Sequence, residues 1–128
     1  MADKKAKAFF KIVIPNYNNI AYAGRCLDSV FQQTFGDFFV VFVDDQSTDF
    51  SYELAKSYER RFPGRLAVLR AGTKRYAGGC RNIGIDYPVE CEYVYFIDSD
   101  DYLYSDMSLR KIYDALGEKP DMLLIGWC

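Results

Sequence analysis

The strongest chemical signal in the sequence is a cluster of three carboxylates, Asp98, Asp100 and Asp101, with Ser99 inside it. The cluster directly follows the apolar run VYFI, which is typical of a buried strand. Neighbouring carboxylates repel one another unless a cation joins them. Oxygen ligands suit a hard divalent ion such as Mg²⁺ or Mn²⁺, which keeps positions open for phosphate oxygens. The cluster therefore predicts a metal site, although a solvated turn that caps a helix shows the same pattern.

A second acidic pair, Asp44 and Asp45, also follows an apolar run and is itself followed by Ser47, Thr48 and Asp49. A carboxylate at this position can accept the N3–H of uracil or thymine, or the N1–H and amine of guanine, and so select a base. The alternative is that the segment caps the next helix, for which Ser47, Thr48 and Asp49 are well suited. Capping does not explain why two aspartates stand side by side.

Two further segments carry groups that fit a nucleotide. Tyr17, two residues after Pro15, places a ring at the end of a predicted strand. Such a ring stacks on a nucleobase with about 1–3 kcal/mol, or packs on a neighbouring loop instead. Gly78 and Gly79 run into a helix and allow a ligand to approach backbone N–H groups, and Arg81 can pair with phosphate. The alternative there is close helix–sheet packing, with Arg81 in a salt bridge to an acid.

Composition limits the remaining chemistry. The 128 residues include no histidine, which removes Ser-His-Asp triads and Cys-His pairs and argues against a zinc site. Half of the residues are apolar and the formal net charge is −2, which predicts one globular domain and no nucleic-acid binding. The four cysteines show no CxxC spacing and are expected to be reduced core thiols.

These groups must be positioned by secondary structure, and strand-like runs alternate with helical patterns along the chain. The expected strands are 9–15 (ended by Pro15), 38–43, 66–69, 93–97 and 122–125, and the expected helices are 22–33, 49–62, 78–87 and 105–116. This order predicts an α/β protein with a mostly parallel, doubly wound sheet. Ligands bind beyond the carboxyl ends of strands in such sheets. The segments expected along that edge are 16–18, 44–45, 74–79 and 98–101.

The chain shows no sign of export or of a membrane span. Residues 1–8 contain lysines but no apolar signal-peptide core, and we expect them to form a disordered tail. No apolar run approaches the length that crosses a bilayer. The sequence predicts a cytoplasmic protein, with docking at the inner face of a membrane left open.

Five blocks, in this order and spacing, resemble the family 2 glycosyltransferases. They are Pro15-x-Tyr17-Asn18, Ser29-Val30-x-x-Gln33-Thr34-Phe35, Val43-Asp44-Asp45-x-Ser47-Thr48-Asp49, Arg81-Asn82-x-Gly84 and Asp98-Ser99-Asp100-Asp101. Each block is weak alone, but five in register over residues 9–103 are specific. The resemblance implies a GT-A (Rossmann-like) fold, a nucleotide-diphospho-sugar donor with a UDP-sugar favoured, and Mn²⁺ or Mg²⁺. It also implies inversion at the anomeric carbon and an acceptor that is a saccharide or a lipid-linked saccharide.

The resemblance further implies roles for the residues that would bind the donor nucleotide. Tyr17, with Pro15 before it, would stack on the base, and Asp45 would bind the base. Arg81 would lie near the ribose or the diphosphate.

The acidic block would form the family's DxD motif. Asp98 and Asp100 would hold sugar, ribose and metal. Ser99 and Asp98 are assigned to the donor nucleotide, and Asp100, Asp98 and Asp101 to the metal. The division of the three acids between donor and metal is left open.

Two features depart from the family pattern. Many members have a glycine where this chain has Tyr76, so the loop before Arg81 is expected to differ. The family's catalytic base and acceptor half lie beyond another strand, and this sequence ends at Cys128. We therefore expect residues 9–128 to be the nucleotide-sugar-binding half of a truncated GT-A domain, with the base beyond Cys128 and no transfer by this chain alone.

Three other functions share part of the pattern. A phosphohydrolase of the haloacid dehalogenase type also has a strand followed by DxD, but on its first strand, and Tyr102 stands where that class has a small residue. A phospho-receiver module has an acidic pair after its first strand, but the later strand that should carry its phosphorylated aspartate ends here at Leu69-Arg70. A nucleotide-binding module without catalysis is the third. Metal-dependent binding of a nucleoside diphosphate is expected only of the transferase.

Overall fold

The computed structural model of the chain describes residues 6–117. The elements follow in the order β1 (Ala6–Asn16), α1 (Ile20–Phe31), β2 (Phe38–Asp44), α2 (Ser51–Arg61), β3 (Leu66–Arg70), α3 (Tyr76–Asp86), β4 (Val89–Phe96) and α4 (Ser108–Ala115). The four strands form one parallel sheet in the order β3-β2-β1-β4. The predicted alternation of strands and helices and the parallel sheet are confirmed.

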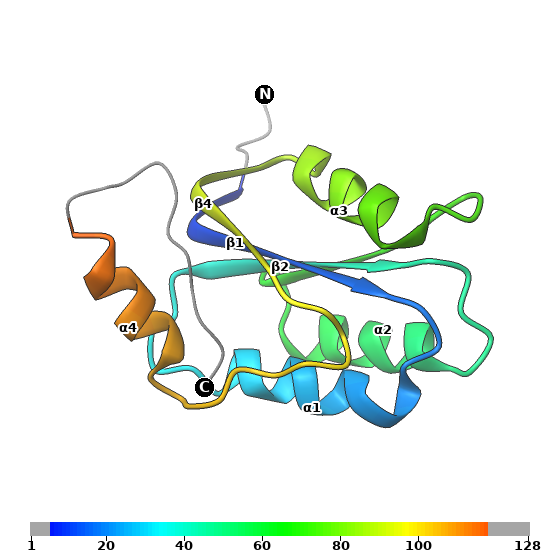
Figure 1. The fold of residues 1–128 in the computed structure, drawn as a ribbon, viewed down its shortest axis with the longest axis horizontal. Coiled ribbons are helices and arrows are strands. Elements are labelled where there is room, and N and C mark those ends of the chain that lie inside the picture. Colours follow the sequence, from blue (N-terminus) through cyan, green and yellow to red (C-terminus); the bar gives the residue numbers. More distant parts are fainter. Residues whose placement is uncertain (1–5, 118–128) are drawn as a thin grey trace.

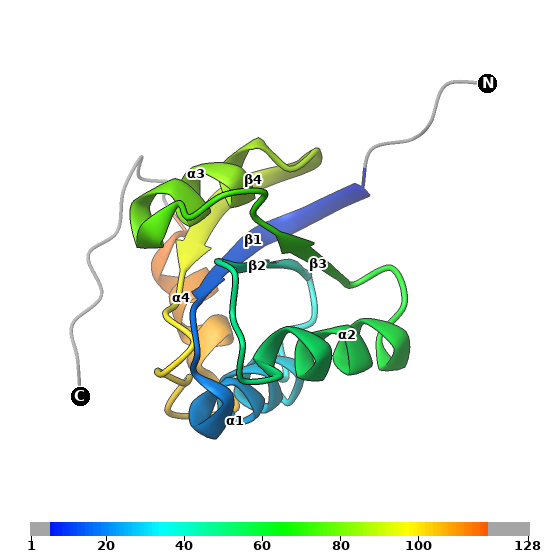
Figure 2. The same cartoon turned by 90° about the vertical axis from the view of Figure 1, so that its right-hand side faces the viewer.

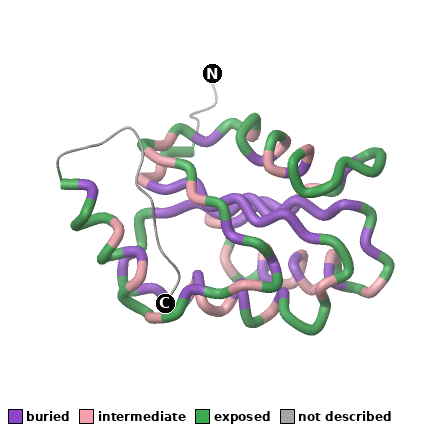
Figure 3. Tube along the Cα trace, viewed as in Figure 1, coloured by how far each residue is buried: buried purple, intermediate pink, exposed green. Residues whose placement is uncertain are grey.

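Helices cover both faces of the sheet, with α3 on one face and α1, α2 and α4 on the other (Figures 1 and 2). Every residue of β2 is buried, as the unbroken apolar run of that strand predicts for a strand covered on both sides. Figure 3 shows the buried residues following the sheet through the centre of the molecule. On α1, the predicted apolar face is buried at Ala23, Cys26, Leu27 and Val30.

The largest differences from the sequence prediction lie where β1 meets β4. β4 begins at Val89, four residues before the expected start, and β1 begins at Ala6. Residues 6–8, which the sequence assigned to a disordered tail, pair with residues 89–91 of β4. Neither residues 6–8 nor residues 89–91 have a strong strand pattern. Each segment forms a strand because the other supplies its backbone hydrogen-bond partners. The predicted strand 122–125 lies outside the described residues.

β1 also runs one residue past its predicted end at Pro15, to Asn16. β4 pairs with β1 only as far as Val13, whereas β2 pairs with it through Asn16. Pro15 therefore lies where β1 has a hydrogen-bonded neighbour on one side only. Proline is tolerated at such edge positions because it has no N–H to contribute to a second ladder.

Helix α3 is held against β1 by close packing and by a buried lysine. A Cβ atom at Gly84 would lie 2.3 Å from Val13, so only glycine fits there. Lys11, almost fully buried on β1, donates from Nζ to the carbonyl oxygens of Ile85 and Tyr87 at 2.6 and 2.7 Å. Burial lowers the pKa of Lys11. These contacts fix α3 and so aim its N-terminus at the carboxyl edge of the sheet.

Within residues 6–117, no helix is long and apolar enough to cross a membrane.

Candidate functional site

The loops that follow β1 and β2 are tied to each other at the carboxyl edge of the sheet, on the right in Figure 1. The Asn18 N–H donates to Ser47 Oγ at 2.9 Å, and the Thr48 N–H donates to Asn18 Oδ1 at 2.8 Å. The Ile20 N–H at the start of α1 donates to Asp49 Oδ2 at 2.9 Å. The segment 47–49 was expected to supply the N-cap of the helix that follows it. The N-cap of α2 is instead Phe50, although Asp49 does accept the Ser51 N–H of α2. Through the Ile20 N–H, Asp49 also fixes the loop that follows β1.

Asp44 is fully buried and serves the fold. Its Oδ1 accepts the Asn16 amide at 2.9 Å, and its Oδ2 accepts the Ser47 N–H at 3.0 Å. Arg70, at the end of β3, lies with its Nε 3.6 Å from the same Oδ2. A buried carboxylate with these partners is structurally satisfied, so Asp44 is closed to a ligand.

Asp45 is also buried, and it starts helix α3. Its Oδ1 accepts the Arg75 N–H and its Oδ2 accepts the Tyr76 N–H, both at 2.7 Å, and Lys74 Nζ lies 3.0 Å from Oδ2. Burial raises the pKa of Asp45, but the hydrogen bonds from Arg75, Lys74 and Tyr76 outweigh it and lower the pKa. This contact explains why α3 begins two residues before its predicted start.

Tyr17 presents a half-exposed ring beside Asp45. Lys74 Nζ lies 3.1 Å from the centre of this ring and 5.3 Å from that of Tyr76. Tyr76, which stands where many family members have glycine, adopts a left-handed backbone with φ of 60° and is largely exposed. The loop before Arg81 brings an ammonium group onto the ring of Tyr17.

The predicted metal ligands come together after β4. Asp98, Asp100 and Asp101 each offer an oxygen, and these atoms lie within 4.8 Å of one another. Arg81 on α3 pairs with Asp98, with Nη2 and Oδ1 3.0 Å apart. The side chain of Asp98 is half exposed and Asp100 is exposed. The donor set is all oxygen, clustered and open to solvent, which fits a hard divalent ion that keeps positions for a ligand.

The charges of this cluster are only partly compensated by the protein. Burial, and then the charges of Asp100 and Asp98, raise the pKa of Asp101, while Arg25 acts in the opposite direction. Arg25, on α1, donates from Nη2 to the Asp100 carbonyl oxygen at 3.2 Å and stacks on Tyr102 with its guanidinium carbon 4.3 Å from the ring centre. Mutual repulsion among carboxylates is the state that a cation relieves.

Helix α1 and the residues just after it hold the segment that follows the cluster. Ser29 Oγ accepts the Leu103 N–H at 3.0 Å. Gln33 donates to the Ser105 carbonyl oxygen at 2.7 Å and accepts the Leu109 N–H at 2.9 Å. Gln33 thus caps α4, which begins three residues later than predicted because the chain before it is tied to α1. Ser29 and Gln33 had no assigned role in the sequence, and only these contacts reveal one.

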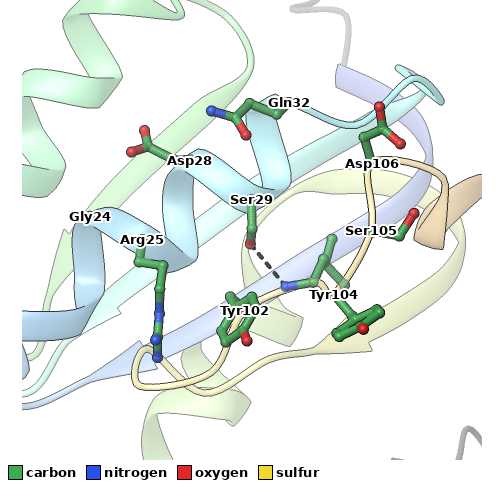
Figure 4. A pocket seen from close by; sticks show the side chains of 10 residues that line it. Gly24, Arg25, Asp28, Ser29, Gln32, Tyr102, Tyr104, Ser105 and Asp106 are labelled. Carbon is green, nitrogen blue, oxygen red and sulfur yellow. Dashed lines mark hydrogen bonds between the residues drawn. The ribbon is translucent and has the colours of Figure 1, made fainter. Parts of the chain in front are cut away.

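A hollow of about 610 Å³ lies between α1 and the segment 102–106 (Figure 4). Its lining includes Gly24, Arg25 and Tyr102, and Figure 4 shows the Ser29 hydrogen bond among the lining residues. Tyr17, Asp45 and the acidic cluster do not line it. The hollow therefore lies beside the candidate site and is not part of it.

The structure thus brings most of the predicted site residues to one edge of the sheet. Two have little surface for a ligand: Pro15 is buried in β1, and Ser99 is buried with its hydroxyl accepting the Asn19 amide at 2.7 Å. The sequence did not assign Arg25 or Lys74 to the site. Each of these cations contacts site residues that are distant from it in the sequence. The ligand roles of all these residues stay predictions.

Three cysteines fall within the described residues, and all are free thiols. Cys26 and Cys80 are buried. Burial raises the pKa of Cys26 to about 12 and that of Cys80 to about 11. Cys26 and Cys80 are core thiols, as expected, whereas Cys91 is only partly buried. Cys128 lies outside the described residues.

Comparison with known proteins places these residues in a family. Residues 11–128 match the sequence model of glycosyl transferase family 2. The chain is 37% identical over 101 residues to the poly(ribitol-phosphate) beta-glucosyltransferase of Bacillus spizizenii, covering 77% of this chain and 16% of that protein. It is 34% identical over 122 residues to a PGL/p-HBAD biosynthesis glycosyltransferase of Mycobacterium tuberculosis, covering 94% of this chain and 47% of that protein. The chain spans less than half the length of either relative.

Solved structures share the fold. The crystal structure of residues 1–349 of S. aureus TarS with UDP-GlcNAc matches with a TM-score of 0.76 and 32% identity, covering 85% of this chain and 31% of that one. A mannosyltransferase from Pyrobaculum calidifontis, in complex with GDP-Man and Mn²⁺, matches with a TM-score of 0.79 and 20% identity, covering 88% of this chain and 33% of that one. The parallel α/β sheet is that of GT-A, Rossmann-like glycosyltransferases, as predicted.

Proposed function

The chain belongs to glycosyl transferase family 2, and from this premise we propose that it forms the donor-binding region of a metal-dependent, inverting glycosyltransferase. The proposed donor is a nucleotide-diphospho-sugar, with UDP as the favoured nucleotide. The acceptor is proposed to be a saccharide or a lipid-linked saccharide, bound outside residues 6–117. No residue within 6–117 is assigned as the catalytic base, so the activity expected of these residues is donor binding.

One observation carries the proposal: three carboxylates converge at the sheet edge that also presents Tyr17 and Arg81. Asp98, Asp100 and Asp101 would hold Mn²⁺ or Mg²⁺. When bound, the ion would neutralise charge on the diphosphate leaving group. Arg81 already pairs with Asp98 and so lies where it can share the diphosphate with the ion.

The nucleobase of the donor would be bound at the same edge of the sheet, by Tyr17 and Asp45 rather than by the acidic cluster. Tyr17 offers a ring for stacking, and Asp45 offers a carboxylate fixed by two backbone N–H groups. An acceptor carboxylate fits the N3–H of uracil. TarS, which is 32% identical, binds UDP-GlcNAc, and this supports uracil over guanine.

Donor and metal should bind cooperatively. A diphosphate brings negative charge to an edge that already carries the three acids of the cluster, so its approach without a cation is repulsive. An ion ligated by both partners replaces that repulsion with shared coordination. Each ligand then raises the affinity of the other by the same factor.

Calorimetry with UDP and GDP, in Mn²⁺ and in chelator, tests the proposal. UDP should bind in Mn²⁺ and bind far more weakly in chelator. Thermal unfolding gives a second measurement, since Mn²⁺ at 100 times its dissociation constant should add about 2.7 kcal/mol to the free energy of unfolding. Equal UDP affinity in Mn²⁺ and in chelator would refute the metal assignment.

Three variants separate the parts of the site. Asp100→Ala should remove the metal dependence of UDP binding, and Tyr17→Ala should weaken UDP binding while the metal dependence remains. Asp114→Ala is the matched control, because Asp114 is an exposed acid that pairs with Arg110 on α4, at the far left in Figure 1. It should leave both properties unchanged. An Asp100→Ala variant that behaves like the Asp114→Ala control would sink the assignment.

A further inference from the structure

Lys74 places its ammonium group between the two residues proposed to recognise the base. Its Nζ lies 3.1 Å from the centre of the Tyr17 ring, which puts the charge directly over the ring face. The same Nζ lies 3.0 Å from Asp45 Oδ2 and 3.4 Å from the Asp45 carbonyl oxygen. Cations over the face of a tyrosine ring are attracted by its quadrupole, so the ring and the carboxylate hold the ammonium together.

These contacts use the groups that a base would need. Each face of a ring accommodates one stacking partner at a time, and Lys74 covers one face of Tyr17. Asp45 Oδ1 already accepts the Arg75 N–H, and Oδ2 already accepts the Tyr76 N–H. The acceptor position that Lys74 fills on Oδ2 is the one that a base N–H would take. The ammonium therefore imitates a base in both of its contacts.

The Lys74 side chain can leave the site while Tyr17 and Asp45 keep their positions. The Asp45 carboxylate is held by the two backbone N–H groups at 2.7 Å and is almost fully buried. Lys74 has a side chain that is about one-third exposed, and a lysine stem has several rotatable bonds. Its side chain can move into solvent while ring and carboxylate stay in place.

We propose that Lys74 is a specificity-determining residue that fills the nucleobase subsite of the free chain and that a donor nucleotide displaces. This inference rests on the proposed function, because it takes Tyr17 and Asp45 as the base contacts. A nucleoside that displaces the ammonium gains only the contacts of its base with Tyr17 and Asp45. A nucleoside diphosphate also meets the displaced ammonium, which the backbone keeps near the site, as a partner for its phosphates. Lys74 therefore selects against bases that carry no phosphate.

Calorimetry with uridine and UDP in Mn²⁺ tests this selection on the wild type and on Lys74→Ala. Uridine affinity should rise in the variant by about three- to tenfold, because an occupied subsite lowers apparent affinity in proportion to the fraction that is free. UDP affinity should stay level or fall, so the preference for UDP over uridine should drop. Lys74→Met keeps the stem without the ammonium. It should change the uridine and UDP affinities in the same directions as Lys74→Ala does.

The matched control is Lys56→Ala. Lys56 lies on α2 and pairs with Glu59 at 2.7 Å, and its removal should leave both affinities unchanged. Uridine affinity that is equal or lower in both Lys74 variants, while UDP binds in a Tyr17-dependent way, would overturn this inference and leave the proposed function standing. Failure of UDP and uridine to bind wild type and variants alike would overturn both.

Proton NMR reports on the contact itself. In the free chain, the Lys74 ε-methylene protons should be shifted upfield by the Tyr17 ring, and Tyr17→Leu should abolish the shift. UDP added to saturation should return these protons toward the values of an unstacked lysine. A shift that persists in UDP-saturated chain would show that the ammonium is not displaced and would overturn the inference.

Discussion

Two groups of aspartates lie at the same edge of one sheet and have opposite environments. Asp44 and Asp45, after β2, are buried, and backbone N–H groups, an amide and two cations satisfy them. The three acids after β4 are clustered and partly exposed, and Arg81 reaches only one of them with an ion pair. Asp44 organises loops. Asp45 starts helix α3 and is also proposed to contact the nucleobase, whereas the second group keeps charge available for a cation.

The comparison shows that residue type and position after a strand do not decide what an acid does. A buried carboxylate with several donors stabilises the fold because its removal leaves those donors without partners. Clustered carboxylates with few donors repel one another and stabilise little. Acids that the fold satisfies should therefore respond to substitution differently from acids that can still bind a ligand.

The largest expected effect is on stability at Asp44. Asp44→Ala should lower the free energy of unfolding by about 3 kcal/mol, because the Asn16 amide and the Ser47 N–H lose a buried acceptor. Asp100→Ala, at an exposed site, should change it by less than about 0.5 kcal/mol. Urea denaturation of both variants at neutral pH provides the measurement. Equal losses would erase the distinction between the two groups of acids.

The pH dependence of stability should have opposite signs for Asp45 and Asp101. The pKa of Asp45 is lowered from 3.8, so its contribution is complete above pH 3.8 and is lost as the pH falls through the lower folded value. The pKa of Asp101 is raised, so its ionisation destabilises the chain above the folded value, and the penalty vanishes as the pH falls below 3.8.

Urea denaturation across this pH range, in chelator, measures both effects. At neutral pH, Asp45→Asn should be less stable than wild type and Asp101→Asn should be more stable. Both differences should shrink toward acid. A pair of curves that shift in the same direction would contradict the assignment of opposite environments.

A small effect on stability is also expected at Arg81. The Arg81–Asp98 pair is substantially exposed on both sides, and exposed pairs contribute about 0.2–1 kcal/mol. Arg81→Ala should therefore stay within that range, while UDP affinity in Mn²⁺ falls. Calorimetry measures the UDP affinity, and urea denaturation measures the free energy of unfolding. A large loss of stability with unchanged UDP affinity would make Arg81 a structural residue.

Much of the fold could be predicted from local patterns. The apolar run of β2 and the periodic face of α1 gave correct elements because burial on both sides, or on one helical face, leaves a signature in consecutive residues. Three of the boundaries that differ from the prediction depend on distant partners. Val89 joins β4 because residues 6–8 pair beside it, α3 starts early because Asp45 accepts its first N–H groups, and α4 starts late because Gln33 holds the preceding segment.

By itself, the sequence determined the alternation of strands and helices, and therefore that acids, an aromatic ring and an arginine meet at the carboxyl edge of a parallel sheet. Only the tertiary structure decided which acids are satisfied and which are free for a ligand. The donors to Asp44 and Asp45 come mainly from segments about thirty residues away in the chain, and the ammonium on Tyr17 comes from Lys74, which is further away still. Burial and hydrogen-bond partners are properties of packed segments, and no local pattern of residues records them.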